Sequence, residues 1–218
     1  MSDMKRLSII TLLILLLILL PLGAQEATSE KSVINFSSDY TRASLHEDQK
    51  SLLLSGNAWI ETGSTRIQAD SIEIFGEESR YISCSGDIEI IDTDQGLIVN
   101  SKNLYYDRVR SLLRIDGWAE MEDRINEIIA KAAYLENSQE TGITLLQISV
   151  KIYKHTEDGP MICMTDSAIY NSIKQSLEMT GNSIVYWKGS SYEASQISVD
   201  LINNEITLEG RVKGTINE

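Results

Sequence analysis

The sequence predicts an all-β fold, an antiparallel β-jellyroll in which two curled sheets face each other in an open V. Three observations predict it. After the first two dozen residues the chain is rich in isoleucine and contains a single proline, Pro160. Short apolar alternations with a period of two are separated by turn residues such as Gly, Asn and Asp. One of these alternations recurs about every 30 residues, which gives about six copies of one unit.

The first 24 residues are predicted to be a leader outside this fold. Lys5 and Arg6 precede an uncharged, almost wholly apolar run from Ile9 to Leu20. Pro21 ends this run, and 22–24 form a loosely Ala-x-Ala-like cleavage site. Two interpretations stay open: a cleaved signal peptide, or an uncleaved helix that anchors the chain in a membrane. In both, the rest of the chain lies outside the cytoplasm. We therefore expect a leader over 1–24, a linker over 25–32 and one folded domain over 33–216.

A strand pattern repeats through this predicted domain. In five copies a glycine lies at the centre of an apolar alternation, as in Leu52, Leu54, Gly56, Ala58 and Ile60. The repeat glycines are Gly56, Gly86, Gly117, Gly181 and Gly210, and Ile148 occupies the same position in a further copy.

A second element follows each glycine by about 13 residues, most clearly at 67–72 and 192–197. Its apolar positions change from odd to even numbers between Ala69 and Ile72. A change of phase within a strand indicates a bulge or a corner at which the side chains are re-aimed. Each unit is therefore predicted to consist of two long antiparallel strands, of which the second is bent.

One stretch of the domain shows helical spacing. Ile125, Ile128, Ile129 and Ala132 would by themselves predict a helix. The segment 129–135, however, falls where the repeat places its second element, so we predict a strand there.

The apolar members of the repeat are predicted to face the interior between the sheets. These residues are Leu52, Leu54, Ile60, Ile67, Ile88, Ile90, Leu113, Ile115, Met121, Val150, Met179, Val185, Leu208 and Val212. The repeat glycines lie on the same face, and two roles stay open for them. Each glycine lets a bulky neighbour from the facing sheet approach, or the row of glycines leaves a lengthwise trough. Trp59 and Trp118 lie on the opposite face and are expected to point outward.

Composition excludes several classes of function. With 32 acidic and 19 basic residues, the formal charge of −13 argues against nucleic-acid binding. The two histidines, His46 and His155, lie in acidic turns without an activated nucleophile, so we expect no catalytic residues. The segment 92–96 lacks the later acid of a calcium loop and predicts a hairpin turn, and we expect no metal and no cofactor. Cys84 and Cys163 are either two small buried hydrophobes or a disulfide.

The repeat resembles the OstA-like family, the periplasmic bridge proteins of lipopolysaccharide transport related to LptA. Ser55-Gly56-Asn57 together with the Ile-Gln-Ala-Asp-Ser-Ile segment at 67–72 matches best, and 177–197 and 209–212 echo the pattern. The resemblance spans 33–216. Departures are Ile148 in place of a glycine, and 100–103 and 165–168 in place of the Ala-Asp motif.

This resemblance implies a jellyroll whose apolar interior holds the acyl chains of lipopolysaccharide or a similar glycolipid, without an enzymatic step. It implies a periplasmic location, or anchoring to the inner membrane if the leader is retained. Anionic headgroups would stay in solvent or meet scattered cations such as Arg66, Lys151, Lys154 and Arg211. As single residues, these cations are expected to be solvated surface charges.

Other jellyroll transport proteins are the implied partners, joined end to end by strand pairing. The same pairing between copies of this chain would give a homo-oligomer. We expect the pairing to use the first strand, Val33–Tyr40, and the last, Ile206–Ile216. The alternative is a structural or assembly module of the cell envelope that uses the same pairing without holding lipid.

Overall fold

The computed structural model describes residues 33–46 and 50–217. The chain divides into two units, Met1–Ser32 and Val33–Glu218. The leader and the linker lie outside the described residues, so both remain predictions. Within the described part, no helix has the length and apolar character that a membrane span requires.

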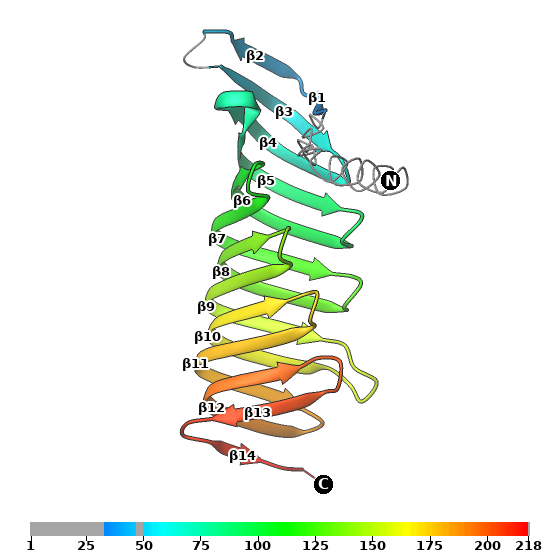
Figure 1. Ribbon diagram of the computed structural model, residues 1–218, viewed down its shortest axis with the longest axis vertical. Coiled ribbons are helices and arrows are strands. Elements are labelled where there is room, and N and C mark those ends of the chain that lie inside the picture. Colours follow the sequence, from blue (N-terminus) through cyan, green and yellow to red (C-terminus); the bar gives the residue numbers. More distant parts are fainter. Residues whose placement is uncertain (1–32, 47–49, 218) are drawn as a thin grey trace, which may run out of the picture. The chain divides into compact units, whose positions relative to one another are not determined.

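The described residues form one antiparallel sheet of fourteen strands, which confirms the all-β prediction. Its order is β1-β3-β4-β5-β6-β7-β8-β9-β10-β11-β12-β13, with β2 paired to β3 and β14 to β12, and Figure 1 shows the strands stacked in sequence order. The strands are β1 (Asn35–Ser37), β2 (Tyr40–Ser44), β3 (Ser51–Thr62), β4 (Thr65–Phe75), β5 (Tyr81–Asp92), β6 (Leu97–Asp107), β7 (Leu112–Asp123), β8 (Ile128–Ser138), β9 (Ile143–Lys154), β10 (Met161–Asn171), β11 (Ser176–Trp187), β12 (Ser190–Asp200), β13 (Glu205–Glu209) and β14 (Lys213–Thr215). A short 3₁₀ helix, η1 (Glu77–Ser79), connects β4 to β5.

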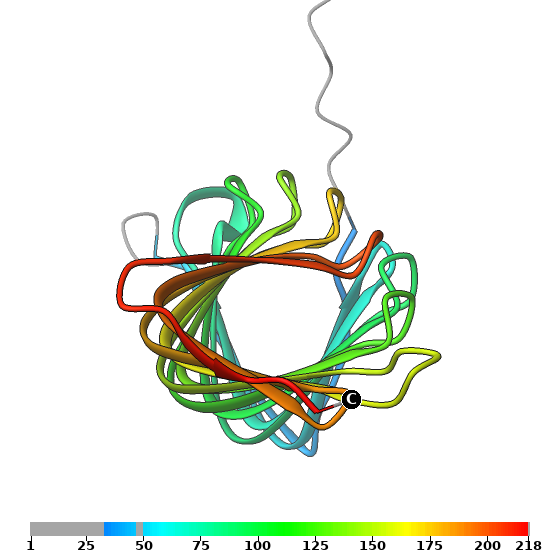
Figure 2. The ribbon, with the colours of Figure 1, turned by 90° about the horizontal axis from the view of Figure 1, so that it is seen from below.

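Each long strand bends at its centre. Between β3 and β4 the pairing shifts from Ser55↔Ser71 to Ala58↔Ala69, so β3 carries one extra residue, and a register shift recurs in every pair up to β11 and β12. The bend therefore crosses both strands of a unit. The extra residue belongs to the strand with the repeat glycine, or with Ile148 in the case of β9. The two facing layers are the two halves of the same strands, and Figure 2 shows these halves bent around the interior.

The repeat glycines form the corners, which corrects both roles that the sequence suggested. Gly181 has a φ of +80°, and a Cβ there would lie 2.7 Å from Oδ2 of Asp166 on the neighbouring strand. The next residue, Asn182, also has a positive φ, and its Nδ2 donates to the same oxygen at 2.8 Å. A polar side chain thus approaches each repeat glycine, where we expected a bulky neighbour from the facing sheet or an empty trough. Gly56 repeats the arrangement with Asp39.

Ile148 occupies the corner of β9 that lacks a glycine. Its φ is +65°, that of Ser149 is +56°, and the Ile148 side chain is 62% exposed. Left-handed backbone is costly for a β-branched residue, so this corner keeps its shape because the surrounding sheet imposes it.

The interior is filled by apolar side chains from the inner faces of both halves. Most of the residues that the sequence assigns to the interior are at most 4% exposed: Leu54, Ile60, Ile67, Ile88, Ile90, Leu113, Ile115, Met121, Val150, Met179 and Val185. Leu52 and Leu208 are partly buried against them. Val212 was wrongly assigned to the interior, because β13 ends at Glu209 and the Val212 side chain is 53% exposed.

Two further predictions are settled by the fold. The segment 129–135 lies in β8, so the predicted strand is confirmed, and Ile125 lies in the turn before it. Cys84 and Cys163 are free and buried, which confirms two small hydrophobes and excludes the disulfide in this structure. Burial raises the pKa of both thiols to about 12.

Candidate functional site

The inner face of the sheet carries unbroken apolar rows along the stack. One row reads Ile60, Ile67, Ile90, Val99, Met121, Ala130, Ile152, Cys163 and Val185, each residue directly opposite the next. A row on the other half reads Ile115, Leu135, Leu146, Ala168, Met179, Ile197 and Leu208. The interior therefore offers a continuous apolar lining across most of the described strands.

The turns between strands form two rims along the stack. The first rim holds the turns after β3, β5, β7, β9 and β11, and the second holds those after β4, β6, β8, β10 and β12. Within each rim, backbone hydrogen bonds join successive turns, as from Arg124 N–H to the carbonyl of Gly96 and from Gln139 N–H to that of Ser111. Each rim is thus a stiff edge of the bent sheet.

A few polar contacts hold the two rims together, and we call this line the seam. The Tyr170 hydroxyl, at the end of β10 on the second rim, donates to Oδ2 of Asp123, at the end of β7 on the first rim, at 2.9 Å. Gln139 Nε2 lies 3.4 Å from Oδ2 of Asp92 across the same line. These contacts link strands that are not neighbours in the sheet, so the seam is where the interior is closed by side chains alone.

A recess of about 360 Å³ opens at the seam and is lined by residues of both rims. Leu97 and Met121 contribute apolar surface, while Asp123, Asn137 and Thr144 contribute buried polar groups. Burial, followed by the neighbouring Asp123 carboxylate, raises the pKa of Tyr170, so its hydroxyl remains a donor over the ordinary pH range. The seam recess thus joins an apolar wall to polar groups, as binding sites for amphipathic ligands do.

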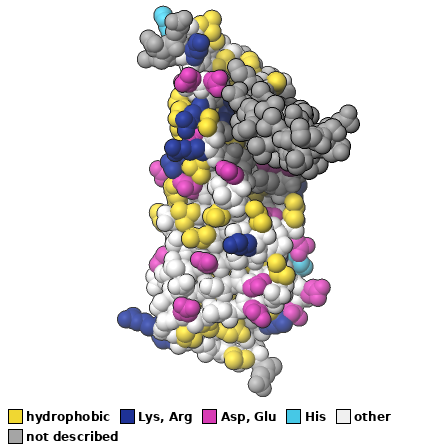
Figure 3. All heavy atoms as spheres, viewed as in Figure 1, with side chains coloured by type: hydrophobic (Ala, Val, Ile, Leu, Met, Phe, Trp, Pro, Cys, Tyr) yellow, Lys and Arg dark blue, Asp and Glu magenta, His cyan; other side chains and the backbone are white. Residues whose placement is uncertain are grey.

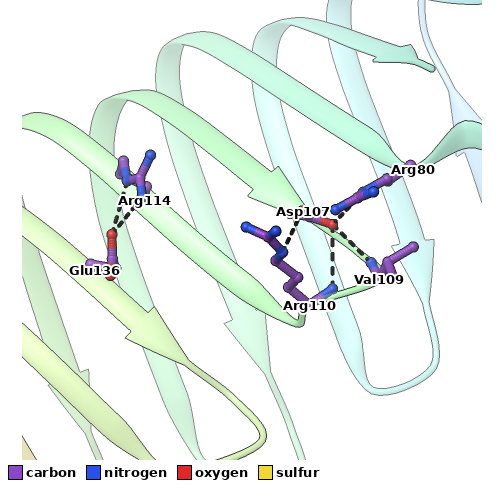
Figure 4. Close-up of polar contacts among 6 residues, drawn as sticks. All are labelled: Arg80, Asp107, Val109, Arg110, Arg114 and Glu136. Carbon is purple, nitrogen blue, oxygen red and sulfur yellow. Dashed lines mark hydrogen bonds and ion pairs between the residues drawn. The ribbon is translucent and has the colours of Figure 1, made fainter.

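A cluster of arginines lies beside the second rim, as Figure 4 shows. Arg80 makes a bidentate pair with Asp107 through Nε and Nη2 at 3.0 and 2.7 Å, and Arg110 Nε lies 3.8 Å from the same carboxylate. Arg114 pairs with Glu136 at 2.8 Å. With Tyr81, Tyr105 and Leu112, these arginines line a recess of about 310 Å³.

The ion pairs set the protonation states of this cluster. The hydrogen bonds from Arg80 hold the pKa of the Asp107 carboxyl below its usual range, and those from Arg114 do the same for Glu136. Arg110 is the most exposed of the cluster, with 72% of its side chain accessible. Its backbone N–H donates to Oδ1 of Asp107 at 3.3 Å, while its guanidinium makes only the long contact with Asp107 among the described residues. It is therefore the arginine best placed to meet an anion from solvent.

The sequence did not reveal this arginine cluster. Of the cations expected to meet a headgroup, Arg66 lies over the Trp59 ring and Lys154 donates to the carbonyl of Asn126 at 2.7 Å. The cluster comes from turns that the sheet brings together, and its sequence signal was the closely spaced Arg108, Arg110 and Arg114. Figure 3 shows acidic side chains spread along the visible face of the stack.

Three further predictions concern the turn at 92–96, metal binding and the direction of Trp118. Oδ1 of Asp92 accepts hydrogen bonds from the N–H groups of Asp94 and Gln95 at 3.1 Å each, which confirms the hairpin turn at 92–96. No group of three or more His, Cys, Asp or Glu residues suited to a metal ion occurs in the part of the chain that the structure describes. Trp118 points outward and is 53% exposed.

An open antiparallel sheet bent around an apolar interior defines a jellyroll. Comparison with known proteins gives the family. Residues 39–205 match the family described as LptA/(LptD N-terminal domain) LPS transport protein. The match covers well over half of the chain, and the chain therefore belongs to this family.

The solved structures include LptH, the LptA homologous periplasmic component of the lipopolysaccharide transport device from Pseudomonas aeruginosa. The likeness covers 86% of this chain and 97% of that one, with 10% sequence identity and a TM-score of 0.27. At these values it adds no support to the assignment, which rests on the family match. None of the curated proteins compared with the chain matches it.

Proposed function

We propose that the protein is a periplasmic bridge that carries lipopolysaccharide or a similar glycolipid from the inner to the outer membrane, without an enzymatic step. The continuous apolar lining of the bent sheet is the observation that carries this proposal. Each methylene group of an acyl chain gains about 0.8 kcal/mol on leaving water, so such a lining binds chains without catalytic or metal groups.

Lipid reaches this lining through the seam. The interior is filled by the protein's own side chains, so an acyl chain needs the two halves to separate. The rims are linked by side-chain contacts such as Tyr170 to Asp123, whereas every other boundary between long strands is a backbone ladder. Separation at the seam is therefore the least costly opening. An anionic headgroup left at the second rim would lie near Arg110 and its neighbours.

End-to-end assembly is the second part of the proposal. The outer sides of β1 and β2, and of β13 and β14, have no partner strand among the described residues. All four strands are short and mostly exposed. Another jellyroll transport protein or a second copy of this chain would extend the sheet there by backbone hydrogen bonds, and the apolar rows would continue across the junction.

Site-specific photo-crosslinking in cells tests the lipid path. Crosslinkers at Leu54, Ile88 and Leu208 replace side chains on the inner face, whereas those at Trp59 and Glu89 replace side chains on the outer face. We expect lipid adducts at the three inner positions and none at the two outer ones. Equal labelling of both faces, or labelling of the outer face alone, would contradict a lipid path through the interior.

The alternative function is an assembly module that holds no lipid, and the close filling of the interior favours it. Native mass spectrometry of protein released gently from the cell envelope distinguishes the two. The carrier retains lipid of defined mass, while the assembly module is found lipid-free but oligomeric. Deletion of 206–218 should abolish concentration-dependent oligomers in sedimentation under both functions, and oligomers that survive it would exclude pairing through the last strands.

A further inference from the structure

The corner at Gly117 differs from the other glycine corners. After Gly56 and Gly181 comes an asparagine, whose Nδ2 donates to the aspartate that lies across the corner. After Gly117 comes Trp118, and a Cβ at Gly117 would meet only Nδ2 of Asn103, at 3.8 Å. The Trp118 indole is exposed and makes no hydrogen bond with any described residue. Trp118 therefore does not hold its corner together as the asparagines hold theirs.

The two strands at this corner also separate further than elsewhere. The pairs of β6 with β7 run from Asn100↔Glu120 directly to Tyr105↔Arg114, so residues 101–104 and 115–119 are not paired with each other. No other pair of long strands has so long an interruption. The gap coincides with 100–103, where the sequence departs from the Ala-Asp motif of the repeat.

An open groove of about 530 Å³ lies at this corner on the outer face of the sheet, and we call it the outer groove. A row in register crosses it, and beside the end of this row lies Trp118; the row reads Gln68, Glu89, Asn100 and Glu120. These residues alternate along their strands with core residues, so the outer groove and the apolar interior lie on opposite faces of the same strands. The row spans three strand spacings of about 4.8 Å each, or about 14 Å.

The polar groups of the outer groove are of two kinds, paired charges and free side chains. Lys102 forms an ion pair with Asp87, and Glu120 forms one with Lys131 at 2.5 Å. The side chains of the other three members of the row make no hydrogen bond or ion pair with any described residue. The groove thus presents two amides that donate and accept, one carboxylate that only accepts, and an aromatic ring, while the lysine that lines it is already paired.

From these features we infer that the outer groove binds a neutral saccharide, with one sugar ring on the Trp118 indole and hydroxyl groups paired to the free side chains of the row. Hydroxyl groups both donate and accept, as this set of partners requires, and the C–H face of a pyranose ring packs on an aromatic face. A length of about 14 Å takes roughly two or three sugar rings.

Two other occupants fit the outer groove less well. Peptides bind sheets chiefly at an edge, through backbone hydrogen bonds, whereas this groove lies on a face whose strands are paired on both sides. A lipid held in the interior is separated from the groove by the sheet itself. The saccharide is therefore a ligand distinct from the carried lipid, and the inference does not rest on the proposed function.

Titration of neutral trisaccharides into the isotope-labelled protein tests the inference. We expect at least one of maltotriose, cellotriose and chitotriose to shift the NMR signals of the Trp118 indole N–H and of the Gln68 and Asn100 side-chain amides. In Trp118→Asn, which gives this corner the asparagine of two other copies, the affinity should fall about five- to tenfold. Tyr153→Asn removes an exposed aromatic ring elsewhere on the outer face and should leave the affinity unchanged.

The stability of Trp118→Asn provides a second readout. A purely structural role for Trp118 predicts a lower urea midpoint in this variant, whereas a binding role predicts an equal or higher one. If the variant does not fold, Glu89→Ala/Asn100→Ala replaces it. Loss of two hydrogen-bonding side chains from the groove should weaken binding about tenfold or more.

The outcomes separate this site from the lipid path. The photo-crosslinker at Glu89, which should capture no lipid, should capture carbohydrate that carries no acyl chain. Capture of a sugar still joined to lipid would assign the groove to the carried glycolipid and overturn the inference. Absence of any shift with all three trisaccharides, or an affinity that is unchanged in Trp118→Asn, would overturn it as well, and neither result bears on lipid binding in the interior.

Discussion

The hydroxyl of Tyr170 donates a hydrogen bond to Oδ2 of Asp123 at 2.9 Å, and it joins two strand ends that lie 47 residues apart in the chain. Asp123 is 4% exposed, and its carboxylate also accepts from the backbone and the side chain of Asn126. This buried carboxylate therefore shapes the turn after β7 on the first rim and holds the second rim at the same time.

Removing the Tyr170 hydroxyl should weaken this link. We expect Tyr170→Phe to lower the free energy of unfolding in urea by about 1–3 kcal/mol, because a buried hydrogen bond to a charged group is lost. The variant should also take up a fluorescent apolar dye faster. Tyr186→Phe, at a side chain that is 41% exposed, serves as the control and should change neither property. Equal effects of the two substitutions would contradict the role of the seam.

The corner at Gly181 predicts that a side chain at this position lowers the stability of the protein. Gly181→Ala combines a strained positive φ with a contact on Asp166, and we expect a loss of about 2–4 kcal/mol of stability. Gly63→Ala is the matched control, since its φ of +58° is also positive but a Cβ there would meet nothing within 4 Å. The difference between the two losses measures the contact. Adding Asp166→Ala to Gly181→Ala should recover part of the lost stability. No recovery would show that the contact with Asp166 does not contribute to the loss.

The corner at Ile148 predicts a substitution that raises the stability of the protein. Replacing it by glycine removes the steric cost of a left-handed backbone, about 1–2 kcal/mol, against an entropic cost of about 0.5–1 kcal/mol. Because the Ile148 side chain is 62% exposed, little packing is lost. We expect Ile148→Gly to raise the midpoint of thermal unfolding by a few degrees, roughly as a gain of 0.5–1 kcal/mol would. A lower midpoint would mean that the side chain contributes more to the fold than its exposure indicates.

Acid should destabilise the protein partly through Asp107. Its pKa is lower in the folded chain than in the unfolded one, mainly because of the hydrogen bonds from Arg80. The resulting stabilisation is present when the pH is above the unfolded-state pKa of about 3.9. It is lost as the pH falls through the folded-state pKa. Asp107→Asn should therefore be less stable than the wild type at pH 7, and the gap in urea midpoint should narrow towards pH 3. A gap that is constant with pH would exclude this ion pair as its source.

Much of the fold could be predicted because its signals are local and periodic. The alternation of apolar residues places the side chains of Leu54, Ile90 and Met179 in the core, whichever strands lie beside them. The repeat also overrode a misleading signal, since helical spacing around Ile128 belongs to a strand. Val212 shows the limit of this reasoning. Its position continues the alternation, but the strand has ended, so no sheet buries it.

The role of the glycines could not be predicted, because it depends on the strand beside them. The sequence shows that Gly181 interrupts an apolar alternation, yet the side chain that meets it, Asp166, comes from the preceding strand. The arginine cluster was missed for a similar reason. Arg80 and Asp107 are 27 residues apart, and only the stacking of successive turns brings them within 2.7 Å.

The amino-acid sequence by itself determined the all-β class, the thirty-residue repeat, the apolar inner face and the resemblance to a transport family, because each depends on the order of residues along one strand or on its recurrence. Only the tertiary structure decided how the edges of the sheet meet. The seam between Tyr170 and Asp123, and the unpaired oxygen of Asn137 beside it, arise from residues on different strands. Their meeting depends on where each strand bends, and a one-residue change at a corner would move them apart.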